Sequence, residues 1–178
     1  MTEQEQPPTE HKADTESYPD RLQVNDELEL RLSSSADVDR LQSWTQDPDV
    51  YKWWEGRPLE RGEIEEKYTG RRLPEVIAYI VEKDKEPIGF IQAWQEDGKQ
   101  GLDMFLSSAA QGQGLGSTVA NALAADLSER GWSKLTVDPA VENEKAIRSW
   151  ARAGFRPNGE FGEDDGRKTQ IMVFKPHS

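Results

Sequence analysis

The sequence contains no cysteine among its 178 residues, which excludes disulfide bonds, a thiol nucleophile and thiolate metal sites. Histidine is almost as scarce. The two histidines, His11 and His177, lie in the terminal segments, so we expect neither a histidine general base nor a zinc site in the folded body. The sequence therefore predicts a protein without a metal cofactor.

Long apolar runs are missing as well. No stretch approaches the roughly 20 apolar residues that a membrane-spanning helix needs. The first twelve residues are polar and acidic and lack the apolar core of a signal peptide. We therefore expect a cytoplasmic protein that does not contact a membrane.

Basic residues are outnumbered, with 22 lysines and arginines against 34 acidic residues and a net charge of −12. Residues 1–20 carry −5 of this charge, which leaves −7 for the rest. We expect residues 1–24 to form a disordered acidic tail and residues 25–178 to form one folded domain. An acidic domain does not suit nucleic acid. It suits a cationic small molecule, although acidic surfaces are also common for solubility alone.

The apolar periodicity predicts strands that first follow one another and then alternate with helices. This order is typical of a mixed α/β sheet, here of six or seven strands with about four helices. The expected strands are 27–32, 76–83, 88–95, 102–106, 134–137, 156–161 and 169–174. The expected helices lie between Ser35 and Asp47, at about 59–68, at about 114–130 and after Asn143.

The most informative segment is a glycine-rich loop between an expected strand and an expected helix. It reads Gln111, Gly112, Gln113, Gly114, Leu115, Gly116 and Ser117, and apolar residues follow at helical spacing. Glycines free the backbone to turn its N–H groups toward one point, where the helix adds the positive end of its dipole. The loop therefore predicts an anion site, most often used for phosphate. It lacks the Gly-Lys-Ser/Thr of a P-loop and the spacing of a Rossmann loop.

The order Gln-x-x-Gly-x-Gly resembles the acyl-CoA pyrophosphate loop of the GNAT acetyltransferase superfamily. A second element supports this. Residues 143–155 (NEKAIRSWARAGF) resemble the motif Asn-x-x-Ala-x-x-x-Tyr-x-x-x-Gly-Phe that follows in that superfamily. The resemblance covers roughly Leu28 to Phe174. It implies a GNAT fold with a splayed sheet and acetyl-CoA as the cosubstrate.

Within that superfamily, four segments resemble aminoglycoside 6′-N-acetyltransferases: residues 47–55, 87–94, 101–103 and 136–139. The resemblance implies a cationic amine as the acceptor and an acetyl transfer by direct attack. Two alternatives stay open. One is a GNAT enzyme for another amine, such as a polyamine, a protein N-terminus or a siderophore precursor. The other is a non-catalytic acyl-CoA-binding module. The oligomeric state is expected to be monomer or homodimer.

The resemblance also implies roles for residues that bind the cosubstrate. Main-chain groups of the glycine loop would hold the pyrophosphate, and the pantetheine arm would lie between the strands 102–106 and 134–137. Asn143 could instead be the N-cap of the last helix. The expected cosubstrate residues are Leu106, Ser107, Gln111, Gly112, Gln113, Gly114, Leu115, Gly116, Ser117, Asn143, Ala146 and Trp150. Trp150 departs from the family's tyrosine, and an indole N–H does not release a proton, so the acid step of the family is in doubt.

Asp103 interrupts an apolar strand and matches the Asp of the family's Gly-Ile/Leu-Asp motif, so we expect it to be the catalytic partner of the amine. An Asp that faces outward from the strand is the alternative. Carboxylates and aromatic faces suit a polycationic acceptor, although paired tryptophans also pack in cores and acidic turns are often only solvated. The expected acceptor residues are Trp53, Trp54, Glu55, Gln92, Trp94, Asp103, Asp138 and Asp165.

Overall fold

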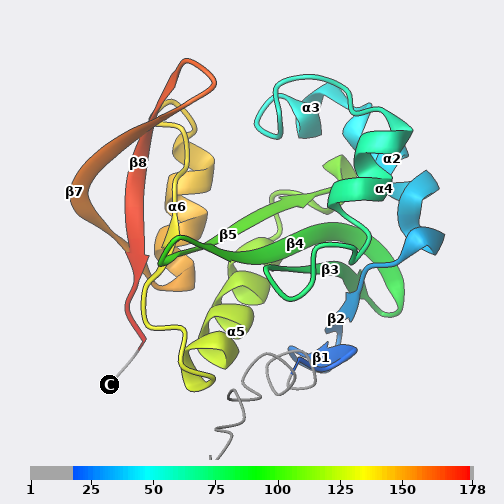
Figure 1. The fold of residues 1–178 in the computed structure, drawn as a ribbon, viewed down its shortest axis with the longest axis horizontal. Coiled ribbons are helices and arrows are strands. Elements are labelled where there is room, and N and C mark those ends of the chain that lie inside the picture. Colours follow the sequence, from blue (N-terminus) through cyan, green and yellow to red (C-terminus); the bar gives the residue numbers. More distant parts are fainter. Residues whose placement is uncertain (1–17, 177–178) are drawn as a thin grey trace, which may run out of the picture.

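The computed structural model describes residues 18–176, which fold around an eight-stranded mixed sheet (Figure 1). The strand order is β1-β2-β3-β4-β5-β6-β8-β7. All neighbouring strands are antiparallel except β5 and β6, which are parallel. The strands are β1 (Arg21–Gln23), β2 (Leu28–Leu32), β3 (Val76–Lys83), β4 (Glu86–Glu96), β5 (Lys99–Leu106), β6 (Leu135–Val137), β7 (Phe155–Asp164) and β8 (Arg167–Phe174).

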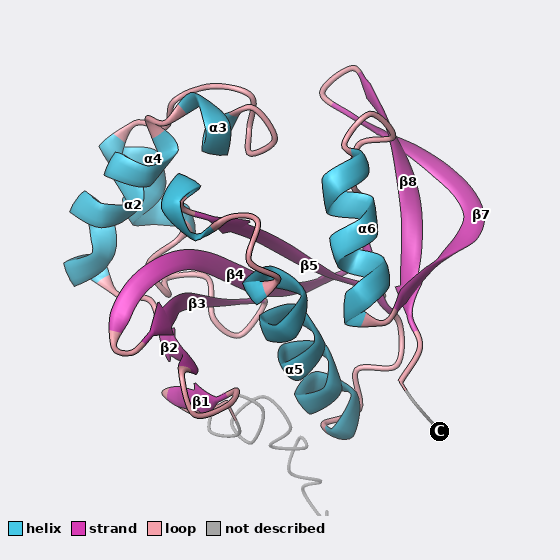
Figure 2. Cartoon of the chain, turned by 180° about the vertical axis from the view of Figure 1, so that it is seen from behind, coloured by secondary structure: helices cyan, strands magenta, loops and turns pink. Residues whose placement is uncertain are grey.

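Helices cover both faces of the sheet (Figure 2). The helices are α2 (Val38–Thr45), α3 (Pro48–Tyr51), α4 (Arg61–Lys67), α5 (Leu115–Glu129) and α6 (Glu144–Ala153), with 3-10 turns η1 (Ser35–Asp37) and η2 (Ser108–Ala110). Strand β3 is buried on both faces because its side chains alternate between two cores. Tyr79 packs into the core under α5 and α6, and Ile80 packs into the core under α2, α3 and α4.

The sheet opens between β5 and β6. These two strands pair only at Gln100 with Leu135 and at Gly101 with Thr136. Beyond these pairs the two strands share no register, so the expected splay is confirmed. The remaining length of β5, from Leu102 to Leu106, therefore has a free backbone edge. In Figures 1 and 2, α6 and the β7–β8 hairpin lie on one side of this opening, and β4 and α3 lie on the other.

The mixed α/β fold is confirmed, with differences at its edges. The sheet has eight strands rather than six or seven because β1 adds to β2 in a segment that was assigned to the disordered tail. Leu22 and Val24 pack against the main core, which explains why this part of the tail is ordered. Residues 1–17 and 177–178, which include both histidines, lie outside the described residues.

The helices differ from the sequence prediction in one place. The described residues 18–176 form five helices rather than about four, because the chain does not leave helical structure at Pro48. Asp47 instead accepts a hydrogen bond from the Asp49 N–H and caps the short helix α3, with Pro48 in its first turn. Within residues 18–176, every helix is too short or too polar to span a bilayer.

Candidate active site

The opening of the sheet leads into a cavity of about 760 Å³. Its walls come from the segment after α3, the free edge of β5, the end of β6, the start of α6 and the tip of the β7–β8 hairpin. Most of the predicted acceptor and pantetheine residues meet here: Trp53, Trp54, Glu55, Gln92, Asp103, Asp138, Asn143, Ala146, Trp150 and Asp165. Residues that were far apart in the sequence therefore share one cavity.

Asp103 lies on β5, directly opposite Gln92 of β4. The Gln92 Nε2 donates a hydrogen bond of 3.1 Å to Asp103 Oδ2. Burial raises the pKa of Asp103 to about 6, the Gln92 hydrogen bond acts in the opposite direction, and the negative charges of Asp138 and Asp164 raise it further. Asp103 is thus no solvated strand residue. It is a carboxylate that can exchange a proton near neutral pH.

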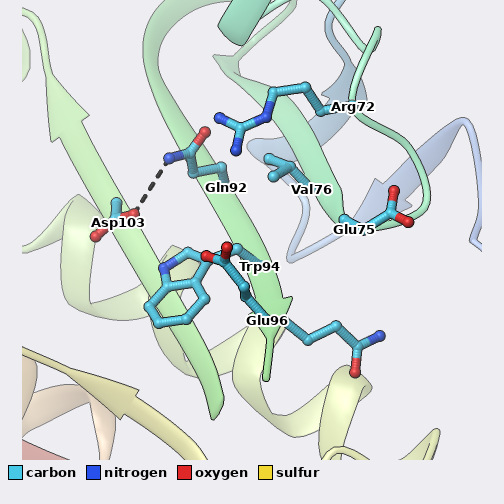
Figure 3. A pocket seen from close by; sticks show the side chains of 8 residues that line it. Arg72, Glu75, Val76, Gln92, Trp94, Glu96 and Asp103 are labelled. Atoms are coloured by element: carbon cyan, nitrogen blue, oxygen red, sulfur yellow. Dashed lines mark hydrogen bonds between the residues drawn. The ribbon is translucent and has the colours of Figure 1, made fainter. Parts of the chain in front are cut away.

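A second cavity, of about 490 Å³, meets the first one at Gln92 and Asp103, which line both (Figure 3). Trp94 lies in this second cavity rather than in the first. Its indole ring lies so close to Gly101 that a Cβ there would come within 2.3 Å of the ring. Figure 3 also shows Gln92 between Asp103 and Arg72; the Gln92 Oε1 is buried and has no hydrogen-bond partner among the described residues.

Asp164 is an acceptor candidate that the sequence did not single out. It lines the main cavity beside Asp165, and its charge raises the pKa of both Asp103 and Asp138. Asp165 is in the two-residue turn of the hairpin, with a left-handed φ of 51°. The acidic run 163–165 was visible in the sequence. The direction in which these acidic side chains point could not be predicted from the sequence, because it depends on where β7 turns into β8.

Asp138 follows directly after β6, at the end of the opposite wall of the notch. The residue as a whole is exposed, but neighbouring atoms partly bury its carboxyl group. This partial burial and the charge of Asp164 raise the pKa of Asp138. It therefore adds a carboxylate across the cavity from Asp103 and is more than a local turn cap.

The paired tryptophans take different positions. Trp54 packs into the second core, with its ring 4.9 Å from Phe105 and 5.8 Å from Phe90. Trp53 is 38% exposed at the cavity mouth. Glu55, the residue after the pair, has a left-handed φ of 59° and accepts a hydrogen bond of 3.3 Å from the hydroxyl of Tyr68. Trp54 is thus a packing anchor, whereas Trp53 is partly exposed and has the cations of Lys52 and Arg167 each 4.9 Å from its ring centre.

The glycine loop presents its N–H groups outward. Gly112 and Gly114 have left-handed φ angles of 78° and 76°, and Gly114 is the N-cap of α5. Within the described part of the chain, no hydrogen bond involves the backbone N–H groups of residues 112–117. Gly116 lies close to β5: a Cβ there would lie 3.1 Å from the end of the Met104 side chain, which would have to shift slightly. The loop therefore offers several free donors at a helix N-terminus, the arrangement that binds phosphate groups.

The free edge of β5 differs in detail from the expectation. The Ser107 N–H donates to the Ile88 carbonyl of the neighbouring chain segment at 2.8 Å, so it faces β4. Successive residues of a strand point their backbone N–H and C=O groups to opposite edges. The backbone groups of Met104 and Leu106 therefore point into the opening between β5 and β6. The Leu106 carbonyl already accepts a hydrogen bond of 2.9 Å from Gln111 Nε2. The Met104 backbone and the Leu106 N–H are thus the donors and acceptors that the notch offers.

The start of α6 forms the other side of the notch. Asn143 Oδ1 accepts a hydrogen bond of 3.2 Å from the Ala146 N–H, so Asn143 is the N-cap of α6 and lines the cavity as well. Trp150, two turns further on, is only 8% exposed and packs edge-on against Phe155 at 5.3 Å. The amide nitrogen of Asn143 therefore remains as a side-chain donor for a ligand.

A splayed sheet with a glycine loop at a helix N-terminus and an acidic cavity beside it defines a coenzyme-dependent acyl transfer site. A family model described as an acetyltransferase (GNAT) domain matches residues 33–162. The chain therefore belongs to the GNAT acetyltransferase family, as the two sequence motifs predicted.

Individual relatives agree with this assignment. Aminoglycoside N(6′)-acetyltransferase type 1 of Klebsiella pneumoniae is 32% identical over 166 residues, which cover 80% of each chain. The solved structure of AAC(6′)-Ib with paromomycin and acetyl-CoA is 27% identical, has a TM-score of 0.75 and is covered over 93% of its length, or 84% of this chain. An acetyltransferase for the N-terminus of ribosomal protein L7/L12 has the same TM-score, 0.75, at 18% identity over 86% of this chain and 96% of its own, which shows a shared fold alone.

Replacing Gln92 by leucine is expected to raise the pKa of Asp103 above about 6. The variant loses the hydrogen bond that stabilises the charged carboxylate, while the burial and the nearby negative charges remain. Titration of the side-chain carboxyl carbon by NMR measures this directly. Gln95→Leu, on the same strand but exposed, is the control and should leave this pKa unchanged. An unaltered Asp103 titration in Gln92→Leu would refute the role given to the hydrogen bond.

Proposed function

We propose that this protein transfers the acetyl group of acetyl-CoA to a primary amine of an aminoglycoside, at the 6′ position. The observation that carries the proposal is Asp103, a partly buried carboxylate with a pKa of about 6, in an acidic and aromatic cavity beside the β5–β6 opening. The names of the relatives support the same substrate class and position.

The cosubstrate side fits this proposal. The diphosphate of acetyl-CoA needs several converging donors, and the free amides of residues 112–117 supply them without a basic side chain. The pantetheine arm carries amides that can pair with the exposed backbone of Met104 and Leu106, as an added strand would. When bound, acetyl-CoA supplies the acetyl thioester. We assign Asn143, Ala146 and Trp150 to the opposite wall of the arm, with the Asn143 amide nitrogen as the donor.

The acceptor side fits a polycation. Five carboxylates line the cavity, against three cationic side chains: Glu55, Asp103, Asp138, Asp164 and Asp165 against Lys52, Arg57 and Arg167. Arg57 is bound by Glu63, outside the cavity, through two hydrogen bonds of 2.9 and 2.8 Å. The exposed part of the Trp53 side chain adds apolar surface for a sugar ring, while the ring itself already contacts the cations of Lys52 and Arg167, each 4.9 Å from its centre. Aminoglycosides combine ammonium groups with sugar rings and so use both features.

The reaction forms a bond between the amine nitrogen and the acetyl carbon, and breaks the bond between that carbon and sulfur. An aliphatic amine is mostly ammonium at neutral pH and must first release a proton. Asp103 orients the ammonium and accepts or relays this proton, which its raised pKa favours. Placing both reactants side by side lowers the barrier further. Because the Trp150 indole does not act as an acid, the sulfur takes its proton from water or from the amine.

An assay of coenzyme A release tests the proposal. The acceptors are an aminoglycoside with a 6′-amine, a matched aminoglycoside with a 6′-hydroxyl, and lysine and spermidine. Turnover with the 6′-amine compound alone supports the proposal. Turnover on spermidine or lysine alone would assign the protein to another amine. Binding of acetyl-CoA with no turnover on any acceptor would indicate a non-catalytic acyl-CoA-binding module.

Asp103→Asn is expected to lower kcat by about 10²- to 10⁴-fold, the usual contribution of a positioned acid or base, and to leave the Kd of acetyl-CoA unchanged. The amide keeps the size of the side chain but neither accepts a proton nor attracts the ammonium. In the parent protein, activity should fall as the pH drops through about 6, where Asp103 becomes protonated. An equal loss of turnover and acetyl-CoA affinity would contradict the assigned role.

Gly114→Val is expected to raise the Kd of acetyl-CoA about tenfold or more, because a valine at a φ of 76° strains the turn that aims the N–H groups. The space around a Cβ at Gly114 is open, so the effect reports backbone geometry and not a clash. Gly98→Val is the matched control, since Gly98 has a φ of 78° and open space in the β4–β5 turn. Calorimetry with coenzyme A measures the Kd of each variant. Similar Kd values in Gly114→Val and Gly98→Val would contradict the proposal that the glycine loop binds the diphosphate.

The cytoplasmic location and the monomeric or homodimeric state stay predictions from the sequence. Both fit a small acidic acetyltransferase that uses a soluble cosubstrate and a small cationic acceptor.

A further inference from the structure

One side chain joins two walls of the acceptor cavity that are distant in sequence. Arg167, at the start of β8, donates a hydrogen bond of 3.0 Å from its Nη1 to the carbonyl oxygen of Lys52. Its guanidinium carbon also lies 4.9 Å from the centre of the Trp53 ring. The segment 52–57 after α3 lines this cavity, and so do Asp164, Asp165 and Arg167 at the tip of the β7–β8 hairpin, residues 164–167. In the ribbon these two segments lie opposite each other (Figure 1).

The sheet itself does not tie this hairpin tip to the 52–57 segment. Strand β8 pairs with β6 only at Val173 and Met172. Closer to the tip, the Lys168 carbonyl accepts a hydrogen bond of 2.9 Å from the Val141 N–H. Arg167 is the next residue, and its side chain crosses to the 52–57 segment. The contact therefore spans 115 positions in sequence and sits at the cavity mouth.

Arg167 binds neutral groups, although carboxylates are near. It lies opposite Asp164 in the β7–β8 register, yet among the described residues no lysine or arginine nitrogen lies within 4 Å of the five cavity carboxylates. A guanidinium can stack on an aromatic ring and donate a hydrogen bond at the same time, which an ammonium group does less well. The carboxylates therefore stay available for a cationic acceptor.

We propose that Arg167 is a positioning residue that clasps the β7–β8 tip to the 52–57 segment and so holds the two acceptor walls at a fixed separation. The inference rests on the proposed acceptor. The clasp holds Asp164 and Asp165 opposite Trp53 and Glu55, so that one polycation can contact both walls. It acts on acceptor affinity and not on acetyl-CoA, whose expected contacts lie at the glycine loop and the β5–β6 notch.

Steady-state kinetics with a 6′-amino aminoglycoside and acetyl-CoA test this inference. Arg167→Ala is expected to raise the KM of the acceptor about fivefold, because only part of the free energy of the lost charged hydrogen bond and cation–ring contact is transmitted to acceptor binding. The KM of acetyl-CoA and kcat should stay within about twofold. Arg167→Lys keeps the charge and should restore part of the affinity.

Lys168→Ala is the matched control. Lys168 is the adjacent cation, lies 4.3 Å from the Phe161 ring and does not line the cavity, so its loss removes the same charge without the clasp. An unchanged or lower acceptor KM in Arg167→Ala would overturn the proposal. So would an equal effect of Lys168→Ala, or a parallel rise of both KM values.

The clasp can also be tested without any acceptor, which separates its failure from that of the proposed function. The protein contains six tryptophans, and 5-fluorotryptophan labelling gives each a fluorine resonance. The Trp53 resonance is assigned by its loss in Trp53→Phe. It should shift in Arg167→Ala and stay in place in Lys168→Ala. If it does not move in Arg167→Ala, the clasp is absent, whether or not the protein turns over aminoglycosides.

Discussion

The structure depends on the short parallel pairing of β5 with β6. Only two residue pairs join these strands, at Gln100 and Gly101 of β5, and then the strands diverge. A sheet with a free backbone edge in its interior exposes polar groups that need partners. Here those groups become a binding surface: β5 offers the backbone of Met104 and Leu106, and α5 begins beside them with unpaired N–H groups. The expected cosubstrate site is therefore a consequence of incomplete sheet pairing.

The same opening concentrates negative charge on the acceptor side. Asp103 lies on β5, Asp138 follows β6, and Asp164 comes from the β7–β8 tip. Burial is the main reason why the pKa of Asp103 reaches about 6, and the charges of Asp138 and Asp164 add to it. The basic side chains of the wall contact groups other than these carboxylates. Arg57 pairs with Glu63, Lys52 lies over the Trp53 ring, and Arg167 contacts the Trp53 ring and the Lys52 carbonyl. The cavity thus combines an acid–base group poised near neutrality with charge that favours a cation.

Much of the fold and of the cosubstrate site could be predicted from short local motifs. The glycine loop and the Asn143-to-Phe155 element carry their geometry in consecutive residues, so their order and spacing indicated the fold and the family. The ends of the strands and of the N-terminal tail were predicted less accurately. The β1 strand was taken for disordered tail because Arg21–Gln23 has little apolar character of its own, and its order comes from packing against the core. From the sequence, the Asn143 side chain was expected either to contact the cosubstrate or to cap the last helix. In the structure it caps α6 and also lines the cavity.

By itself the sequence determined the class of site, since glycines at 112, 114 and 116 and an aspartate in an apolar strand have few other uses in that order. Only the tertiary structure decided which side chains meet. Asp164 and Asp165 differ by one position in a hairpin, and the turn alone sets how each is aimed. Trp94 lies in a neighbouring cavity because its ring stacks on Gly101. Arg167 reaches Trp53 across 114 positions of sequence because the strand order brings the hairpin opposite α3, and no local pattern encodes that distance.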